Sequence, residues 1–335
     1  MQRLARAMSS PDGVLVTGGA GFVGSHLVRN LEARGRRVAV IDDLSTGRAE
    51  NLPATSPILS FLKGDVCDHS VIRPLVRAAS LVFHLAAAVG TRRVANDPAG
   101  AIRRNVDGTR AIIEECAQAG VPLVYVSSSS VYQFGRANGN VLLDESVELH
   151  PAGRHPISLY AETKLMAELL CDVYRRAAGL RCLIVRPFNL IGPGQSPSYG
   201  GVLPVFVSCA LEGRALPVYG DGNQTRVFSD VRQAVELLWS LTSRVDFAGQ
   251  IMNLATNDRE WRIIDLAHVV GRVVGKPVSF CFTPYEEALG TDYFEPMHRQ
   301  PCLTRLRSLL EPWQPIAIEQ TIAAVRDYEL SGPAW

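Results

Sequence analysis

An apolar strand, a glycine-rich turn and a helix follow one another near the start of the chain, and this order constrains the fold more than any other feature. Val14–Thr17 is a short apolar run, the turn carries Gly18, Gly21 and Gly24, and Ser25–Ala33 has a helical pattern. Gly18 permits the tight turn, Gly21 lets the backbone approach a pyrophosphate, and Gly24 lets the helix pack closely on the strand. The helix N-terminus then presents free N–H groups to the phosphates. The pattern predicts a dinucleotide-binding α/β fold.

A second apolar strand, Arg37–Ile41, ends at two adjacent aspartates, Asp42 and Asp43. Asp42 stands eighteen positions after Gly24. An acid near this spacing binds the ribose hydroxyls of NAD and repels the 2′-phosphate of NADP. A glycine-rich turn followed by a solvated aspartate pair is the alternative. Strand, glycines, helix, strand and acid in this order favour NAD as the cofactor.

Strand-like and helix-like segments alternate in the following part of the chain. The expected strands are Ile58–Lys63, Leu81–Leu85, Leu123–Ser127 and Arg181–Val185. The expected helices are Ser70–Ala79, Ala99–Gly120 and Ser158–Gly179. Such alternation predicts a doubly wound parallel sheet (a Rossmann fold) with helices on both faces. We expect residues 12–187 to form the NAD-binding domain. Residues 188–330 would mainly form a smaller C-terminal substrate-binding lobe, with a strand near 250–256 that returns to the main sheet.

Composition and charge exclude several classes of protein. The 335 residues are 47% hydrophobic and 20% charged with a formal net charge of +1, which is ordinary for a globular protein and does not indicate a nucleic-acid surface. No apolar core of signal-peptide length follows Arg3 and Arg6, and no apolar run is long enough to span a membrane. The seven cysteines lack a C-x-x-C spacing. We therefore expect reduced thiols, no metal site and a cytoplasmic protein.

Tyr160 and Lys164 lie four residues apart in a segment where Leu165, Leu169 and Val173 recur at helical spacing. Residues four apart are neighbours on a helix. A lysine charge beside a phenol favours the phenolate, so we expect Lys164 to lower the pKa of Tyr160 below about 10. Such a phenol takes a proton from a sugar or alcohol hydroxyl near neutral pH. An accidental surface pair is the alternative, and the upstream cofactor signature favours the catalytic interpretation.

Motifs spread from Val14 to about Pro315 resemble those of one family. They are Gly18–Gly24, Asp42–Gly47, Gly64–Val66, His84–Ala87, Asn105–Thr109, Ser127–Tyr132, Tyr160–Lys164, Arg186–Asn189 and Gly220–Arg226. In this order they are similar to the motifs of extended short-chain dehydrogenase/reductases of the nucleotide-sugar epimerase/dehydratase family. The resemblance implies NAD as the cofactor and a nucleotide sugar, above all a UDP-sugar, as the substrate. It also implies a homodimer formed through the two long helices, 99–120 and 158–179.

The same resemblance implies which residues bind NAD. Asp42 would bind the adenosine ribose, Asp65 would contact the adenine, and Asn105 would lie on the path to the nicotinamide. The full set of expected cofactor contacts is Gly18, Gly21, Phe22, Val23, Gly24, Asp42, Asp43, Ser45, Thr46, Gly47, Asp65, Val66, Leu85, Ala86, Ala87, Asn105, Tyr160, Lys164 and Pro187.

Catalytic and substrate-binding roles follow from the resemblance as well. Tyr160 would be the base, Lys164 would lower its pKa, and Ser128 would hydrogen-bond the reacting hydroxyl. Arg226 would pair with the nucleotide diphosphate, to which a guanidinium binds bidentately. The expected substrate contacts are Ser128, Ser129, Ser130, Asn189, Val202, Arg226 and Arg299.

Members of the family share their first half-reaction, in which the tyrosine removes the proton of the sugar 4-hydroxyl while hydride passes from C4 to NAD. A 4,6-dehydratase resembles Thr-Asp-Glu where this chain has Ser128, Ser129 and Ser130, so an acid–base elimination lacks its carboxyl groups. A glucuronate decarboxylase typically has a Glu in place of Ser130 and an Arg in place of Leu165. Small hydroxyl side chains leave room for a 4-keto ring to turn over. We therefore expect 4-epimerisation of a UDP-sugar of the UDP-glucose/galactose or UDP-glucuronate class, with UDP-glucuronate decarboxylation and NDP-glucose 4,6-dehydration as the alternatives.

Arg299 bears on the substrate class. The resemblance puts it at the gate that limits the C2 and C6 substituents, where it would pair with a sugar carboxylate and favour UDP-glucuronate. A solvated arginine or a diphosphate contact is the alternative. Two other functions are also open: a non-catalytic NAD-binding regulator, which generally lacks the Tyr or the Lys, and a net reductase. Asp42 argues against a reductase that uses NADPH.

Overall fold

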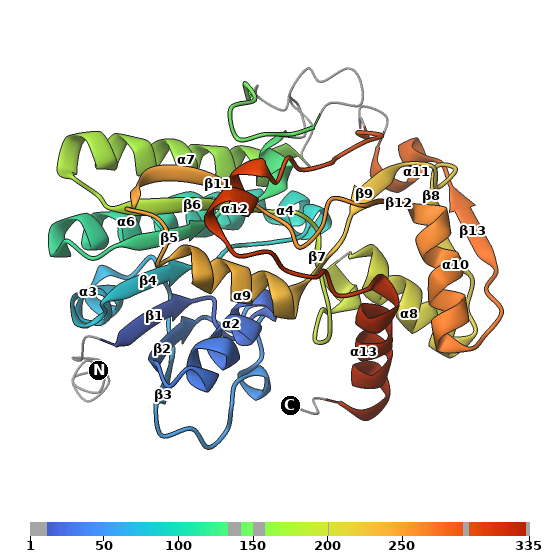
Figure 1. Ribbon diagram of the computed structural model, residues 1–335, viewed down its shortest axis with the longest axis horizontal. Helices are drawn as coiled ribbons and strands as arrows, with labels where there is room; N and C mark the ends of the chain where they lie inside the picture. The colour runs from blue at the N-terminus through green and yellow to red at the C-terminus, as the bar shows by residue number, and fades with distance from the viewer. Residues whose placement is uncertain (1–11, 133–141, 150–157, 200, 291–294, 333–335) are drawn as a thin grey trace.

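The computed structural model describes residues 12–132, 142–149, 158–199, 201–290 and 295–332. Its centre is a sheet of seven strands in the order β11-β6-β5-β4-β1-β2-β3, and all neighbours run parallel. The strands are β1 (Gly13–Thr17), β2 (Arg37–Asp42), β3 (Leu59–Lys63), β4 (Leu81–His84), β5 (Leu123–Val126), β6 (Cys182–Pro187) and β11 (Ala248–Leu254). Helices cover both faces of this sheet (Figure 1). The predicted doubly wound parallel sheet is confirmed.

Each face of the sheet has its own apolar core, because successive strand residues point to opposite sides. The flanking helices are α2 (Phe22–Ala33) and α9 (Val231–Leu241) on one face, and α3 (His69–Ala78), α6 (Gly108–Ala119) and α7 (Leu159–Ala178) on the other. Within β1, Val14 and Val16 pack toward α2 and α9, whereas Leu15 packs toward α3 and α6. Strands that are apolar on both faces are typical of a buried parallel sheet.

A third apolar core lies outside the main sheet, in the C-terminal part of the chain. It joins α8 (Val202–Glu212), α10 (Ile263–Val274) and α13 (Ile318–Ser331). Three two-stranded sheets surround it: β8 (Leu216–Tyr219) with β13 (Phe280–Thr283), β9 (Thr225–Val227) with β12 (Glu260–Arg262), and β7 (Leu190–Ile191) with β10 (Ser229–Asp230). β11 nevertheless pairs with β6 in the main sheet. The division into two domains at residue 187 stays a prediction.

The helix expected over Ala99–Gly120 is confirmed, but a π-helical turn widens it near its start. α5 (Pro98–Ile102) is followed by a π-helical turn, η2 (Arg103–Asp107), before α6 begins. The hydroxyl of Thr109 donates to the carbonyl oxygen of Asn105 at 2.6 Å. The side-chain amide of Asn105 forms hydrogen bonds with the backbone of Ala88, outside the helix. These contacts accompany the widened turn, which local helical periodicity does not predict.

The remaining short elements connect the larger ones. They are η1 (Ala49–Asn51), α4 (Thr91–Asn96), η3 (Ser129–Tyr132), η5 (Pro197–Tyr199), α11 (Tyr285–Leu289) and α12 (Thr304–Leu309). Among the helices that the structure describes, none combines the length and the apolar character needed to cross a membrane.

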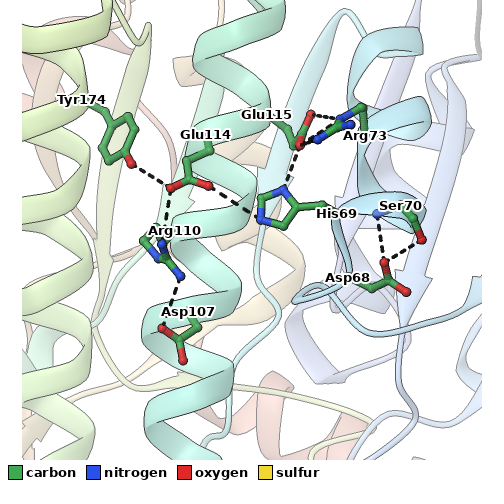
Figure 2. A network of polar contacts seen from close by, with 9 residues as sticks. All are labelled: Asp68, His69, Ser70, Arg73, Asp107, Arg110, Glu114, Glu115 and Tyr174. Carbon is green, nitrogen blue, oxygen red and sulfur yellow. Dashed lines mark hydrogen bonds and ion pairs between the residues drawn. The ribbon is translucent and has the colours of Figure 1, made fainter.

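A polar network fixes α6 between its two neighbouring helices (Figure 2). Glu115 on α6 accepts hydrogen bonds from Arg73 on α3 and contacts Nδ1 of His69 at 2.8 Å. On its other side, Glu114 accepts a hydrogen bond from the hydroxyl of Tyr174 on α7 at 2.8 Å. Only 1% of the Glu115 side chain is exposed, so these partners compensate the burial of its charge.

Candidate active site

One cavity of about 780 Å³ runs along the carboxyl ends of the sheet strands. This is the edge at which open α/β sheets bind their ligands. Most of the expected cofactor and substrate residues line it: Gly18, Gly21, Phe22, Val23, Gly24, Asp42, Asp43, Ser45, Thr46, Asp65, Val66, Leu85, Ala86, Ala87, Ser130, Tyr160, Lys164, Pro187 and Asn189.

The glycine turn is built as a close-packed cradle between β1 and α2. Gly18 has a φ of +70°, and its N–H donates to the carbonyl oxygen of Ile41 at 2.8 Å. A Cβ atom on Gly24 would lie 2.1 Å from the carbonyl oxygen of Gly18. Only glycine fits there without separating the helix from the strand. The N-terminus of α2 therefore opens into the cavity, where it can bind the pyrophosphate of a dinucleotide.

The carboxylates at the ends of β2 and β3 lie at one half of the cavity. Asp42 accepts hydrogen bonds from the N–H groups of Ala20 and Leu44 at 3.0 and 2.8 Å. Burial raises the pKa of Asp42, and these bonds partly oppose the shift. Asp65 is held by an ion pair with Arg103. Two carboxylates presented beside the phosphate turn suit the hydroxyls of an adenosine ribose and the donor groups of an adenine.

Tyr160 and Lys164 face the cavity from the first turns of α7, and Ser128 lies opposite them at the end of β5. The side chain of Ser128 is near enough to the phenol of Tyr160 to act against the rise of its pKa. The ammonium of Lys164 donates to the carbonyl oxygen of Val126 at 2.8 Å and lies 5.0 Å from the ring centre of Tyr125. The structure thus brings together the phenol, the ammonium and the hydroxyl that the sequence predicts for proton transfer.

The expected effect of Lys164 on the phenol is wrong in the structure as described. Burial raises the pKa of Tyr160 above its usual value, and the hydrogen bond with Ser128 only partly opposes the shift. Burial also lowers the pKa of Lys164 to about 8, against the influence of the Glu168 carboxylate. The sequence-based argument treated both groups as solvated, whereas Lys164 is only 4% exposed. Desolvation is the largest cause of both shifts, and neither pKa is set by the other group.

Three expected cofactor or catalytic residues lie outside the cavity lining. Asn105 is 1% exposed, and its amide bonds to the backbone of Ala88 and to the hydroxyl of Thr163, so it fixes the loop after β4 against α7. Gly47 packs against the backbone of Ala20. Ser128 stands behind Ser130, because its oxygen contacts both the hydroxyl and the N–H of Ser130 at 3.1 Å.

Four expected substrate contacts also lie outside the lining: Ser129, Val202, Arg226 and Arg299. Arg226 is 8% exposed and forms an ion pair with Glu295, and its guanidinium also donates to the carbonyl oxygen of Pro296 at 2.9 Å. Its charge is therefore already matched, which the sequence could not show because Glu295 lies 69 positions away. Ser129 is buried in η3, and Val202 begins α8. The predicted roles of Arg226 at a diphosphate and of Arg299 at a sugar stay predictions.

Some cavity residues were not among the predicted site residues, although Gly64 and Ser127 belong to motifs noted in the sequence. They are Arg48, Asn51, Gly64, Val89, Gly90, Arg104, Val126, Ser127, Gly194, Gln195, Ser196, Pro197, Ser198, Gly201, Tyr328 and Glu329. Tyr328 and Glu329 belong to α13, close to Arg48, whose charge acts on both. The glycine- and proline-rich composition of residues 192–197 predicts a loop but not its place beside the phosphate turn. Nothing in the local pattern of α13 marks it as part of the cavity wall.

His84 is packed rather than available for catalysis, as its position in a strand suggested. Its ring contacts the hydroxyls of Thr17 and Thr109 at 2.7 and 2.9 Å. Burial, reinforced by the charge of Lys164, lowers the pKa of His84 to about 3. The ring is therefore neutral at physiological pH and ties β1 to α6. Among the described residues, no group of three or more His, Cys, Asp or Glu is placed to hold a metal ion.

Comparison with known proteins adds an independent line of evidence. The NAD dependent epimerase/dehydratase family matches the chain over residues 14–255. The UDP-N-acetyl-alpha-D-glucosaminuronate decarboxylase of Bacillus cytotoxicus is 32% identical over 325 residues, which cover 94% of this chain and 98% of that protein. UDP-glucuronic acid decarboxylase 4 of Arabidopsis thaliana is 35% identical over 320 residues, which cover 94% of this chain and 68% of that protein.

Among solved structures, the UDP-glucose 4-epimerase of Thermus thermophilus, in complex with NAD, is similar with a TM-score of 0.83. The two sequences are 26% identical, and the match covers 96% of this chain and 99% of that one. Similarity along nearly the whole chain therefore extends to proteins with two different activities on UDP-sugars.

Proposed function

Because the chain belongs to the NAD dependent epimerase/dehydratase family, we propose that it catalyses the 4-epimerisation of a UDP-sugar through a transient 4-keto intermediate. The cofactor is NAD, and the residues present fit it. At Gly18 and Gly24, where the helix meets the strand, there is no space for a side chain. The carboxylates of Asp42, Asp43 and Asp65, at the ends of β2 and β3, line the same cavity. The chain is therefore an enzyme of an NAD-dependent family, and its reaction is the subject of this proposal.

The observation that carries the proposal is where carboxyl groups occur along the cavity. Among the described lining residues they are Asp42, Asp43, Asp65 and Glu329. The first three follow β2 and β3, and Glu329 lies beside Arg48, which follows β2. Tyr160 and Ser130 belong to the half near β5 and β6. β2 and β5 are three strand spacings apart in the sheet, roughly 14 Å. This arrangement supports a reacting end lined by hydroxyls, without an acid–base pair for eliminating water.

The chain's own residues can transfer the proton of a sugar hydroxyl. Tyr160 would accept the proton of the 4-hydroxyl at its phenolic oxygen, and Ser128, whose side chain acts on that phenol, would orient the hydroxyl. Bound NAD⁺ supplies the hydride acceptor and a positive ring charge that favours ionisation of a nearby phenol. Once the 4-keto ring has turned over, C4 would take the hydride back on its other face and Tyr160 would return the proton to the oxygen at C4. After one turnover, the sugar and the cofactor have the same oxidation states as at the start.

Decarboxylation of a UDP-uronate is the second candidate, because the two curated relatives described above carry that activity. A 4-keto uronate is a β-keto acid, which loses carbon dioxide once C4 is oxidised. Against this candidate stand Ser130 and Leu165, at the positions where decarboxylases of the family typically have Glu and Arg. The shared first step means that both reactions require Tyr160.

A product analysis separates the candidates. The enzyme is incubated with UDP-glucose, UDP-galactose, UDP-glucuronate and their N-acetyl forms, and the products are identified by NMR and mass spectrometry. An isomer of unchanged mass supports epimerisation, whereas loss of carbon dioxide or of water identifies decarboxylation or dehydration. A product of the last two kinds, with no isomer, would overturn the proposal.

Substitution of Tyr160 tests the assigned base. We expect Tyr160→Phe to lower kcat by about 10²–10⁴-fold while NAD binding persists, because the phenyl ring keeps its packing but cannot exchange a proton. Tyr174→Phe is the matched control: it removes a hydroxyl from the same helix that bonds to Glu114 and lies outside the cavity lining. Equal kcat values for the two variants would refute the role of Tyr160.

We also propose that two copies associate through α7 and α6. α7 exposes Met166, Leu169 and Val173 at 47%, 54% and 56%, and their spacing puts them on one face of the helix. Exposed apolar side chains grouped on one helix face are typical of a surface that binds another protein. A symmetric dimer would cover the same face on both copies.

A further inference from the structure

A buried carboxylate lies directly below the reacting end of the cavity and takes no part in the mechanism above. Glu168 is on α7, one helical turn after Lys164, and is 5% exposed. It accepts a hydrogen bond from the hydroxyl of Ser127 at 2.5 Å. Arg186 binds it with two nitrogens, Nε at 3.0 Å and Nη2 at 2.6 Å. Bidentate pairing of this kind fixes the orientation of both side chains.

The partners of Glu168 belong to the elements that form the floor of the cavity. Ser127 follows β5 and lines the cavity, and Arg186 precedes Pro187, which lines it at the end of β6. Arg186 also donates to the hydroxyl of Tyr132 at 2.8 Å, and that hydroxyl donates to Asn253 of β11 at 2.8 Å. One carboxylate therefore connects α7 with the carboxyl ends of three adjacent strands.

Glu168 is also the negative charge that acts on Lys164. The titratable groups that surround these two side chains from the neighbouring elements are His84 (β4), Tyr125 (β5), Tyr132 (η3), Tyr160 and Cys171 (α7) and Arg186 (β6). Burial keeps His84 and Tyr125 neutral, because it lowers the pKa of the imidazole to about 3 and raises that of the phenol. Burial also raises the pKa of Tyr132 to about 12. The cations of this group are therefore Lys164 and Arg186, and both act on the carboxylate of Glu168.

We propose that Glu168 is a positioning residue for the reaction: it holds Ser127 and β6 in place and keeps the side chain of Lys164 in its cationic form. Two buried cations then share one carboxylate, and only Lys164 faces the cavity. The expected change in kcat rests on the proposed function. The expected effect of Glu168 on Lys164 rests on the structure alone.

The test uses variants of the full-length enzyme that separate the charge of Glu168 from its packing. Glu168→Gln keeps the size and an acceptor for Ser127 but removes the charge, whereas Glu168→Asp keeps the charge on a shorter side chain. A nearby opposite charge shifts a pKa by about 1–3 units. The alkaline limb of the kcat–pH profile, where kcat falls as Lys164 loses its proton, should therefore lie at least about one pH unit lower in Glu168→Gln than in wild type. With a Lys164 pKa of about 8, this lowers kcat about fivefold at pH 8 and little at pH 6. Glu168→Asp should keep the wild-type alkaline limb.

Glu115→Gln is the matched control for losing a buried, arginine-paired carboxylate. Glu115 lies on α6 with Arg73, outside the cavity lining, so its variant should lose stability without moving the alkaline limb. A uniform fall of kcat at every pH in Glu168→Gln, parallel to wild type, would show a purely structural role and overturn the proposal.

Folding could fail in Glu168→Gln, because Arg186 would be left as an unpaired buried cation. The double variant Glu168→Met with Arg186→Met removes both charges and should show the same displaced limb, since Glu168 is the charge that acts on Lys164. The affinity for NAD, measured by calorimetry from pH 6 to 9, gives a readout that needs no turnover. As pH rises, NAD affinity should begin to fall at a lower pH in the variants than in wild type. Superimposable curves of affinity against pH would overturn the proposal. A wild-type enzyme inactive on every UDP-sugar would instead refute only the proposed function.

Discussion

Replacing Gly24 by alanine should weaken both the fold and NAD binding. The added Cβ atom would lie 2.1 Å from the carbonyl oxygen of Gly18 and 2.7 Å from Cα of Gly19, and both contacts are with backbone. Carbon atoms in contact are normally about 3.5–4.0 Å apart, so α2 must move away from β1 by about 1 Å or more. Overpacking of this kind costs about 1–3 kcal/mol. The upper part of this range is expected, because no flexible side chain is available to move aside.

Gly21 offers a contrasting position in the same turn. A Cβ atom there would meet the carbonyl oxygen of Gly18 at 3.2 Å, a contact that a shift of a few tenths of an ångström relieves. The stability of the ligand-free Gly21→Ala variant should therefore stay close to that of wild type. Its NAD affinity should still fall at least about tenfold, about 1.4 kcal/mol, because the methyl group stands where the backbone approaches the pyrophosphate.

Two measurements on each variant test this reasoning. Tm of the ligand-free protein should fall by several degrees in Gly24→Ala and by much less in Gly21→Ala. Calorimetry with NAD and with ADP-ribose, which shares the pyrophosphate but lacks the nicotinamide, should show the same fold loss for both ligands. A Gly24→Ala variant with wild-type Tm and wild-type affinity would refute the cradle geometry, and a loss confined to NAD would refute the assignment of Gly21 to the pyrophosphate.

Two further predictions concern α6 and α7. Hydrogen bonds from Arg73 and His69 outweigh the burial of Glu115 and hold its pKa below the usual value, so its contribution to stability is present above about pH 4.3 and is lost as pH falls below that value. Glu115→Gln should therefore lower Tm at pH 7 but much less at pH 3.5, and an equal loss at both would contradict the argument. Leu169→Asp should convert a dimer to monomers in sedimentation while the Tm of the monomer stays similar, because Leu169 is 54% exposed in the single chain. A wild-type protein that is monomeric, or a variant that remains dimeric, would exclude this face as the interface.

Features that depend on neighbouring residues in the sequence were predictable. Most strands of the sheet are apolar runs bounded by turn residues, and the glycine turn has its strand before it and its helix after it, so local pattern and tertiary structure agree there. The same holds for Tyr160 and Lys164, whose four-residue spacing on a helix puts both at the cavity. The π-helical turn η2 was not predictable, because the contacts of Asn105 with Ala88 and Thr163 reach 17 and 58 positions along the chain.

Burial and distant partners, which a short motif does not reveal, limit electrostatic predictions. Lys164 was expected to lower the pKa of Tyr160, but both groups are desolvated, and neither residue's degree of burial is visible in a four-residue motif. Arg226 was expected to bind a diphosphate; the structure pairs it with Glu295, and its role at a diphosphate stays a prediction. A charge in a motif has no defined role until its partners are known, and these partners come from other segments of the chain.

The two halves of the cavity differ in how their residues are brought together, and this difference bears on function. The half at β1, β2 and β3 is assembled largely from consecutive turns, and its glycines and carboxylates suit a dinucleotide. The half at β5 and β6 combines Ser130, Tyr160, Asn189 and the loop after Gly192, with Glu168 and Arg186 below it. These groups come from the turn after β5, from α7 and from the segment that begins at Arg186, and none of them belongs to the glycine turn, so a substitution there can change the chemistry while that turn is kept. Hydroxyls in place of a carboxylate at position 130 therefore carry more weight for the reaction than overall identity to decarboxylases, because identity counts mainly the residues that build the shared sheet.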